Sequence, residues 1–535
     1  MSEAGDTAID LKELYGELWD RGVMGGGVTI AVPDTEIDSA TLALQATISP
    51  QGAPNFPLGV IETIALAGPP SATPPLKSHG GAVISRIMQV APAAKIIHFP
   101  IFNPQAEQQT LLGALALSAE NSADVVNLSL GIPVRIDEIE AHYRNCPVCH
   151  RAETMVAEHD SLVFAAVGNW AEQALGCPGL APNVTAVGSV LTAKESAYYK
   201  QHPGQQLAHF LEGRSSTSYA TAIASASCCL YRSAFPAIDS STWLKMQRIA
   251  SGHITPGTPN YDEPIEVFKY FREIFSADYI NAPDWRKLHD NGIRNRRELV
   301  AAVDKPHPPA LSEIFGWATV HRARAKAFAD AVDHYILALD DDDQKSDAAV
   351  RIDEAGIAAD MFTRLSLSRM AAAAWVLRAS ALCQRARIVT NGQTSINLKA
   401  VTDAYQNTRS ALGVLAQPQT DTETAIKATA LSWGARALTF LAEVDHAANE
   451  SAIEEATRAA GMLAALKPTR AITKDLAHAY LHLARAFFFR KKVYTKDSTG
   501  DSARVVANAS KALRLGGAGD DYTRSESEWL IVNAG

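Results

Sequence analysis

The sequence lacks the features that would mark a secreted or membrane-bound protein. Its opening stretch, MSEAGDTAIDLKEL, has no basic segment followed by an apolar one, so we expect no secretory signal. No apolar run reaches the ~18 residues that a membrane-spanning helix needs. The chain has six cysteines among 535 residues, too few for a disulfide framework. These absences predict a reduced, cytoplasmic protein without a membrane partner.

An excess of basic residues is also missing. The formal net charge is −9, whereas a nucleic-acid-binding protein needs clustered Lys and Arg to neutralise phosphates. We therefore expect no nucleic acid as a direct partner. The hydrophobic fraction of 47% is that of a globular protein, and 535 residues exceed the length of one hydrophobic core. The composition predicts two or three globular domains.

The first part of the chain, residues 1–253, alternates short apolar runs with helical stretches. The runs are β-branched and bounded by turn residues, which is typical of buried strands. They span residues 27–38, 94–102, 123–131, 161–169 and 183–190, and helical stretches at 108–120 and 134–158 lie between them. This order predicts an α/β domain with a mostly parallel sheet and helices on both faces.

A proline-rich stretch, residues 254–310, follows this domain. It contains TPGTPNYDEP, NAPDW and DKPHPP, which interrupt helices, but IEVFKYFREIF has a helical pattern. We interpret it as a partly helical connector.

Residues 311–535 have almost no strand signal and are rich in alanine. An aromatic, a small and a large apolar residue recur at offsets 0, 4 and 7, and a helix with small residues at the same offsets follows each time. The first set comprises Trp375, Ala379, Leu382, Trp433, Ala437, Phe440, Tyr480, Ala484 and Phe487; the second comprises Ala404, Thr408, Ala411, Ala452, Ala456, Ala459, Val505, Ala509 and Ala512. This pattern resembles tetratricopeptide (TPR) repeats, which bind proteins. A non-repeating helical bundle is the alternative.

Polar residues stand where several predicted strands of the first domain end. Asp34 ends one strand, His79 opens the helical stretch SHGGAVISRIMQV, and the hydroxyl-rich GRSSTSYATA precedes another helix. Open parallel sheets bind ligands beyond the carboxyl ends of their strands. Each feature alone is typical of a cap or a turn, but the order Asp, His, Ser is also that of a serine-protease triad.

Five sequence blocks in the right order extend this likeness over most of the first domain. They are VTIAVPDTEID, SHGGAVISRI with VAPAAKI, VVNLSLG, VFAAVGN with APNVTAVGSV, and SSTSYATAIA. The domain resembles the subtilisin-like serine proteases (subtilases, family S8). The resemblance implies a serine endopeptidase that acts on protein or peptide substrates and needs no cofactor.

The resemblance also implies roles for individual residues. Ser218 would be the nucleophile, His79 the general base and Asp34 the carboxylate that orients it. Asn169 would donate to the oxyanion. Ser129, Leu130 and Gly131 would pair with the substrate backbone. The pocket for the residue before the scissile bond would be flanked by Gly131, Ala166 and Gly168.

The chain departs from the family pattern at several positions. Glu36 and Ser216 replace glycines, Ala222 replaces a proline and Tyr219 replaces a methionine. Gly81-Ala82 stands where the family has Thr-His. These changes bear on the shape of the site and the level of activity, but they leave the triad intact.

No propeptide is visible before Asp34, so a cytoplasmic protease of this kind needs another restraint. We expect the TPR-like domain to supply it by binding a protein partner that regulates or targets cleavage. Protease-plus-repeat architecture also suits an effector in a bacterial defence or signalling pathway. The alternative is a weakly active or inactive pseudoprotease that acts as a protein-binding scaffold.

The segment HYRNCPVCH has a Cys-x-x-Cys motif between two histidines. His142, Cys146, Cys149 and His150 could supply four zinc ligands from one short segment. A second Cys-x-x-Cys is lacking elsewhere, which favours reduced structural thiols and no metal; Cys146 and Cys149 are thus weak metal candidates. We expect Cys177 to be buried without a further role.

Overall fold

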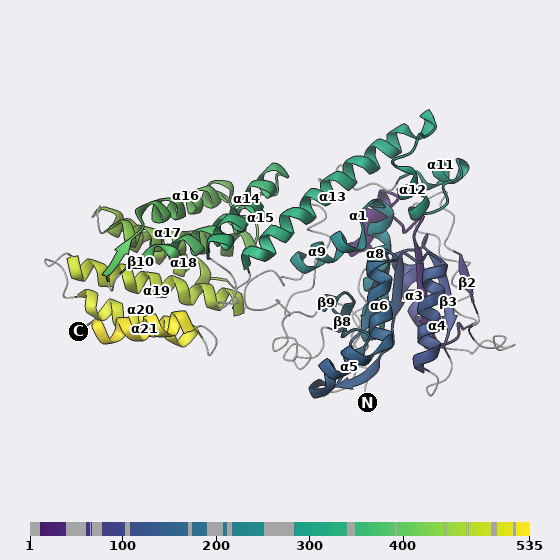
Figure 1. Cartoon of the computed structure of the whole chain (residues 1–535), viewed down its shortest axis with the longest axis horizontal. Coiled ribbons are helices and arrows are strands. Elements are labelled where there is room, and N and C mark those ends of the chain that lie inside the picture. Colours follow the sequence, from purple (N-terminus) through teal and green to yellow (C-terminus); the bar gives the residue numbers. More distant parts are fainter. Residues whose placement is uncertain are drawn as a thin grey trace. The chain divides into compact units, whose positions relative to one another are not determined.

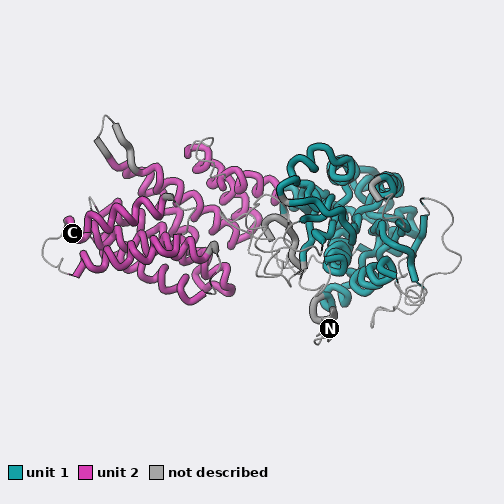
Figure 2. The backbone as a smooth tube through the Cα atoms, turned by 90° about the horizontal axis from the view of Figure 1, so that it is seen from below, with its two compact units in different colours: residues 1–253, 261–326 teal, residues 254–260, 327–535 magenta. Residues whose placement is uncertain are grey.

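The computed structural model describes most of the chain in two compact units. One unit comprises residues 1–253 and 261–326, and the other comprises residues 254–260 and 327–535 (Figure 2). The described residues are 11–38, 60–64, 66, 78–101, 107–168, 174–189, 207–210, 217–250, 283–339, 348–390, 393–442, 445, 447–466, 468, 470–493, 500–516 and 521–534. The residues of α13 (Ser312–Leu339) are divided between the two units at position 326.

A seven-stranded sheet forms the centre of the first unit, with the order β2-β3-β1-β4-β6-β8-β9. Every neighbouring pair in it is parallel. The strands are β1 (Thr29–Asp34), β2 (Ile61–Thr63), β3 (Lys95–Pro100), β4 (Val125–Leu128), β6 (Leu162–Ala166), β8 (Thr185–Ser189) and β9 (Leu207–Phe210). The predicted parallel sheet is confirmed, and the five predicted strands are β1, β3, β4, β6 and β8.

Helices pack around this sheet in two pairs, α3 (His79–Val90) with α8 (Thr217–Ala234) and α4 (Glu107–Glu120) with α6 (Pro147–Ala157) (Figure 1). Seventeen residues of α8 are buried, most of them alanine, serine or cysteine. Such small side chains let the helix approach β4, β6 and β8 closely. The N-terminal end of α8 is thereby held beside the strand ends that were expected to carry the site.

The predicted helix over 134–158 is divided into several elements. β5 (Ile132–Arg135) pairs antiparallel with β7 (Ala174–Cys177), and the turn η1 (Ile136–Glu138) leads into α5 (Ile139–Asn145). α6 then begins at Pro147. Proline fits the first turn of a helix because the missing N–H has no partner there, so it separates α5 from α6. α1 (Leu11–Asp20) and α9 (Ser240–Ala250) complete the first part of this unit.

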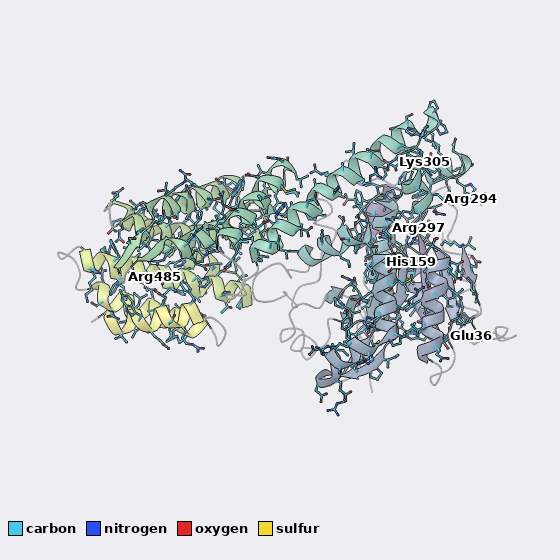
Figure 3. The ribbon with its side chains drawn as sticks, viewed as in Figure 1. Glu36, His159, Arg294, Arg297, Lys305 and Arg485 are labelled. Carbon is cyan, nitrogen blue, oxygen red and sulfur yellow. The ribbon has the colours of Figure 1, made fainter. Side chains whose placement is uncertain are left out.

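Two short helices from the predicted connector belong to the first unit. α11 (Trp285–Asp290) lies against Gly27, where an added Cβ would come within 2.4 Å of the Trp285 ring. In α12 (Arg296–Ala302), the buried Arg296 forms ion pairs with Asp124 at 3.2 Å and Asp160 at 2.8 Å. The neighbouring Arg297 (labelled in Figure 3) donates to the Ala123 carbonyl at 2.8 Å. The sequence interpretation assigned these helices to a connector; residues 254–282 lie outside the described residues.

The second unit is built from helices that pack on their neighbours in the sequence (Figures 1 and 2). After α13 they are α14 (Ala348–Arg364), α15 (Ser368–Arg385), α16 (Leu398–Val414), α17 (Asp421–Leu441), α18 (Ala447–Ala464), α19 (Arg470–Val493), α20 (Asp501–Leu515) and α21 (Asp521–Asn533). A hairpin of β10 (Arg387–Thr390) and β11 (Gln393–Ile396) connects α15 to α16. The helical character predicted for this region is confirmed.

The small residues singled out in the sequence lie in the core of this unit. The alanines at 404, 456 and 509 are fully buried, and the aromatic Trp433 and Phe487 pack in the same clusters. α15 contacts α17 and α17 contacts α19, so alternate helices also stack. Burial of this kind requires small side chains at the helix crossings. A TPR-like repeat agrees with this packing but stays a prediction.

None of the helices that the structure describes combines the length and the apolarity needed to cross a bilayer.

Candidate active site

Asp34 and His79 form a hydrogen-bonded pair at the carboxyl end of β1, an inner strand of the sheet. Asp34 is the last residue of β1 and is buried, and His79 is the first residue of α3. The distance from His79 Nδ1 to Asp34 Oδ1 is 2.7 Å. The Thr35 backbone N–H donates to the same oxygen at 2.7 Å. The carboxylate can thus hold the imidazole with Nδ1 protonated and Nε2 free to accept a proton.

The turn after β1 is bonded to the first turn of α3. Asp38 Oδ2 accepts the Ser78 N–H at 2.9 Å, and Thr35 Oγ1 accepts the Gly80 N–H at 2.8 Å. Ser78 caps the helix, because its hydroxyl accepts the Gly81 N–H at 2.9 Å. A Cβ at Gly80 would lie 2.1 Å from the Thr35 carbonyl oxygen, so only glycine fits there. These contacts fix the position of His79 relative to Asp34.

The pair changes the proton affinity of His79. The hydrogen bond to Asp34 and its negative charge raise the pKa of His79 above 6.5, against the opposing effect of burial. His98 lies on the neighbouring strand β3, and its Nε2 donates to the Thr35 carbonyl at 2.8 Å. Burial lowers the pKa of His98 below 6.5. The two histidines near Asp34 therefore titrate on opposite sides of their ordinary value.

Ser218 lies in the first turn of α8 and is largely buried. Its Oγ donates to the Ser129 carbonyl at 3.0 Å, and Ser129 Oγ donates in turn to the Ser218 carbonyl at 2.8 Å. The next residue, Tyr219, stacks against the His79 ring with centroids 6.4 Å apart and planes at 18°. The structure thus brings the start of α8 beside His79 and joins it to the end of β4.

The segments expected to bind substrate approach one another closely. Ser129, Leu130 and Gly131 connect β4 to β5, and Ala166 ends β6. A Cβ at Gly131 would lie 3.3 Å from the Ala166 carbonyl oxygen, and one at Gly176 would lie 2.5 Å from the same atom. Gly168 has φ 97°, a conformation that favours glycine. Small residues are therefore required where these three backbones meet.

The positions that depart from the family pattern have different surroundings. Glu36 (labelled in Figure 3) is half-buried in the turn after Asp34, and Ala222 is fully buried in α8. The predicted oxyanion residue Asn169 and the departure at Ser216 lie outside the described residues. With Glu36 and Ala222 at these positions, the Asp34 carboxylate and the His79 imidazole are in contact with each other.

The cysteine motif has a different set of neighbours from the one the sequence suggested. Cys146, Cys149, Cys177 and His142 come together, with their four possible ligand atoms within 4.8 Å of one another. His150 is exposed, and its Nε2 donates to the Arg144 carbonyl at 3.3 Å. The interpretation that paired the motif with His150 is wrong on this point. Cys177 was missed because it follows Cys149 by many residues and joins it only through the fold.

Two residues beside the Asp34–His79 pair make contacts that the sequence did not indicate. Asp38 holds the start of α3 and Tyr219 stacks on His79. Asp38 is 40 residues away from Ser78 in the sequence, so no local pattern indicated that it would hold the start of α3. Nothing in the local pattern indicated the partner of Tyr219.

Comparison with known proteins agrees with these features. The model of the subtilase family matches residues 25–255. The major intracellular serine protease of Bacillus subtilis (strain 168) is 26% identical over 196 residues, which cover 34% of this chain and 56% of that protein. The match thus spans little more than half of the relative's length. Together these findings support a subtilase domain, which belongs to the serine protease class, in the first unit.

Some solved structures are also similar to part of this chain. The prenylagaramide maturation protease PagA has 19% identity and a TM-score of 0.35, covering 51% of this chain and all of that one. A lanthipeptide protease has 14% identity and a TM-score of 0.33, covering 50% and 96%. TM-scores this low leave the structural likeness without weight for function.

Proposed function

We propose that the first unit is a serine endopeptidase in which Ser218, His79 and Asp34 act as the triad. The observation that carries the proposal is the 2.7 Å contact between His79 Nδ1 and the buried Asp34 Oδ1, next to the start of α8. A serine hydroxyl is a poor nucleophile at neutral pH and needs a base to take its proton. An imidazole oriented by a buried carboxylate is that base.

The chemistry follows from these positions. Ser218 Oγ would leave its bond to the Ser129 carbonyl, attack the substrate carbonyl and pass its proton to His79 Nε2. His79 would then protonate the leaving amine, and water would release the acyl group by the same route. The Ser218 N–H, at the N-terminal end of α8, and Asn169 would donate to the oxyanion. Ser129 to Gly131 would hold the substrate as an added strand.

The test is covalent labelling of the full chain with a fluorophosphonate probe. We expect labelling in the wild type, loss of labelling in Ser218→Ala, and retained labelling in Ser225→Ala. Ser225 is a matched control because it is a buried serine of the same helix, bonded to the Asn127 side chain at 3.0 Å. Labelling that persists in Ser218→Ala would contradict the assignment of the nucleophile.

One observation favours a second candidate, a scaffold without protease activity. The Ser218 hydroxyl donates to the Ser129 carbonyl, a contact that competes with His79 for the same proton. If the wild type is not labelled under any condition while circular dichroism shows a folded chain, the scaffold is the better assignment. The same experiment therefore separates the two functions.

We also propose that the helical unit binds a protein partner that regulates or targets the protease, and that the protein acts in the cytoplasm. A TPR-like array would present packed helices for such a partner. The isolated chain is then expected to cleave a generic peptide slowly. A full rate without any partner would contradict the regulatory part. A role as an effector in bacterial defence or signalling would be one setting for such control.

A further inference from the structure

A cluster of three cysteines and one histidine lies apart from the triad in the first unit. The Sγ atoms of Cys146 and Cys149 are each 3.4 Å from Cys177 Sγ, and all three side chains are buried. His142 completes the group, with every possible ligand atom within 4.8 Å of the others. The cluster draws on three separate elements, α5, α6 and β7, so the tertiary fold assembles it.

Each of these elements presents its ligand for a local reason. Cys146 is the N-cap of α6 and Cys149 lies in the first turn of that helix. Both cysteines thus belong to the N-terminal end of the same helix. His142 is on the preceding helix α5, and Cys177 is the last residue of β7. The antiparallel pairing of β7 with β5 holds Cys177 in place.

The geometry fits a four-coordinate metal ion. With Zn–S bonds of about 2.3 Å, a tetrahedral site separates its sulfurs by about 3.8 Å, close to the distances found here. Cys177 Sγ is equally distant from the sulfurs of Cys146 and Cys149, so the geometry favours no one disulfide pair. His142 Nε2 is buried and has no hydrogen-bond partner in the part of the chain described. A buried ring nitrogen beside three sulfurs has a natural partner in a metal ion.

We propose that His142, Cys146, Cys149 and Cys177 bind one structural Zn²⁺ ion. Three thiolates and an imidazole select zinc over hard cations, and four protein ligands leave no open position for catalysis. The ion joins β7 to α5 and α6. Because β7 pairs with β5 directly after the expected substrate segment 129–131, the ion also supports that wall of the proposed active site.

The first test is metal content. We expect the full chain, purified from zinc-containing medium and desalted, to carry about one zinc per chain by mass spectrometry of the metal. Cys177→Ser is expected to retain at least about ten-fold less zinc, since loss of a residue that only hydrogen-bonds a metal ligand already lowers metal affinity about ten-fold. Cys228→Ala is the matched control, because Cys228 is a buried thiol of the same unit outside the cluster, and it should keep the zinc.

A second measurement uses the wild type and does not depend on a variant that folds. Titration with an organomercurial is expected to release zinc as three thiols react, and cobalt substitution is expected to show the visible bands of a tetrahedral thiolate site. A wild type without zinc and without these cobalt bands would overturn the proposal. So would a disulfide among the three cysteines in freshly isolated protein. The zinc proposal does not depend on protease activity: Ser218→Ala should lose fluorophosphonate labelling and keep the metal.

Discussion

Gly80 offers a direct test of how the Asp34–His79 pair is held. The added Cβ of Gly80→Ala would lie 2.1 Å from the Thr35 carbonyl oxygen, far inside an ordinary contact. That oxygen cannot move freely, because it also accepts the hydrogen bond from His98 Nε2. The turn after β1 and the start of α3 must therefore separate by about 1 Å, which would take the 2.7 Å bond between His79 and Asp34 out of range.

The magnitude follows from this displacement. A misplacement of about 1 Å in a catalytic group costs about 100-fold in rate, and overpacking of a tight contact costs about 1–3 kcal/mol in the free energy of unfolding. The rate is measured as fluorophosphonate labelling of the full chain, and the stability by urea unfolding followed by circular dichroism. Both should fall in Gly80→Ala.

Gly113→Ala is the matched control. Gly113 lies inside α4, and among the described residues its added Cβ would meet only Leu66 Cδ2, at 3.8 Å, an ordinary contact. We expect unchanged labelling and a gain of about 0.5–1 kcal/mol, since alanine loses less backbone entropy in a helix. A Gly80→Ala chain as stable and as readily labelled as the wild type would refute the reasoning.

Two further predictions concern proton affinity and helix packing. In NMR titration, the midpoint of His79 should lie above pH 6.5 and that of His98 below it. Asp34→Asn should lower the pKa of His79, because the hydrogen bond and the charge of Asp34 are what raise it. The pKa of His79 is raised in the folded protein, so its pairing with Asp34 stabilises the fold fully below pH 6.5. This stabilisation is lost as the pH rises through the raised pKa of His79. A His79 midpoint below pH 6.5 in the wild type would contradict this. In α18, Ala456→Leu should cost about 1–3 kcal/mol in the free energy of unfolding, because it overpacks a fully buried site. Gly461→Ala should stabilise the same helix, because its added Cβ would meet no atom of the described residues within 4 Å. Equal unfolding midpoints for the two variants would contradict this packing.

The sequence alone determined much of the first unit. Continuous β-branched runs bounded by turns predicted β1, β3, β4, β6 and β8, because a strand buried on both faces must be apolar throughout. Asp34 and His79 were also singled out, since Asp34 ends a predicted strand, His79 begins a predicted helix and their order matched a known pattern. The helical character of most of residues 348–533 followed from the helical spacing of their apolar residues, which is also a local pattern.

Contacts between distant segments were decided only by the tertiary structure. Cys177 joins Cys146 and Cys149 because β7 pairs with β5, and Arg296 reaches Asp124 because α12 packs against the start of the sheet. The sequence around Cys177 and Arg296 has no pattern that indicates these distant contacts. Helix and strand patterns arise from neighbours a few residues apart, whereas the cluster and the buried ion pair depend on which chain segments the sheet topology brings together.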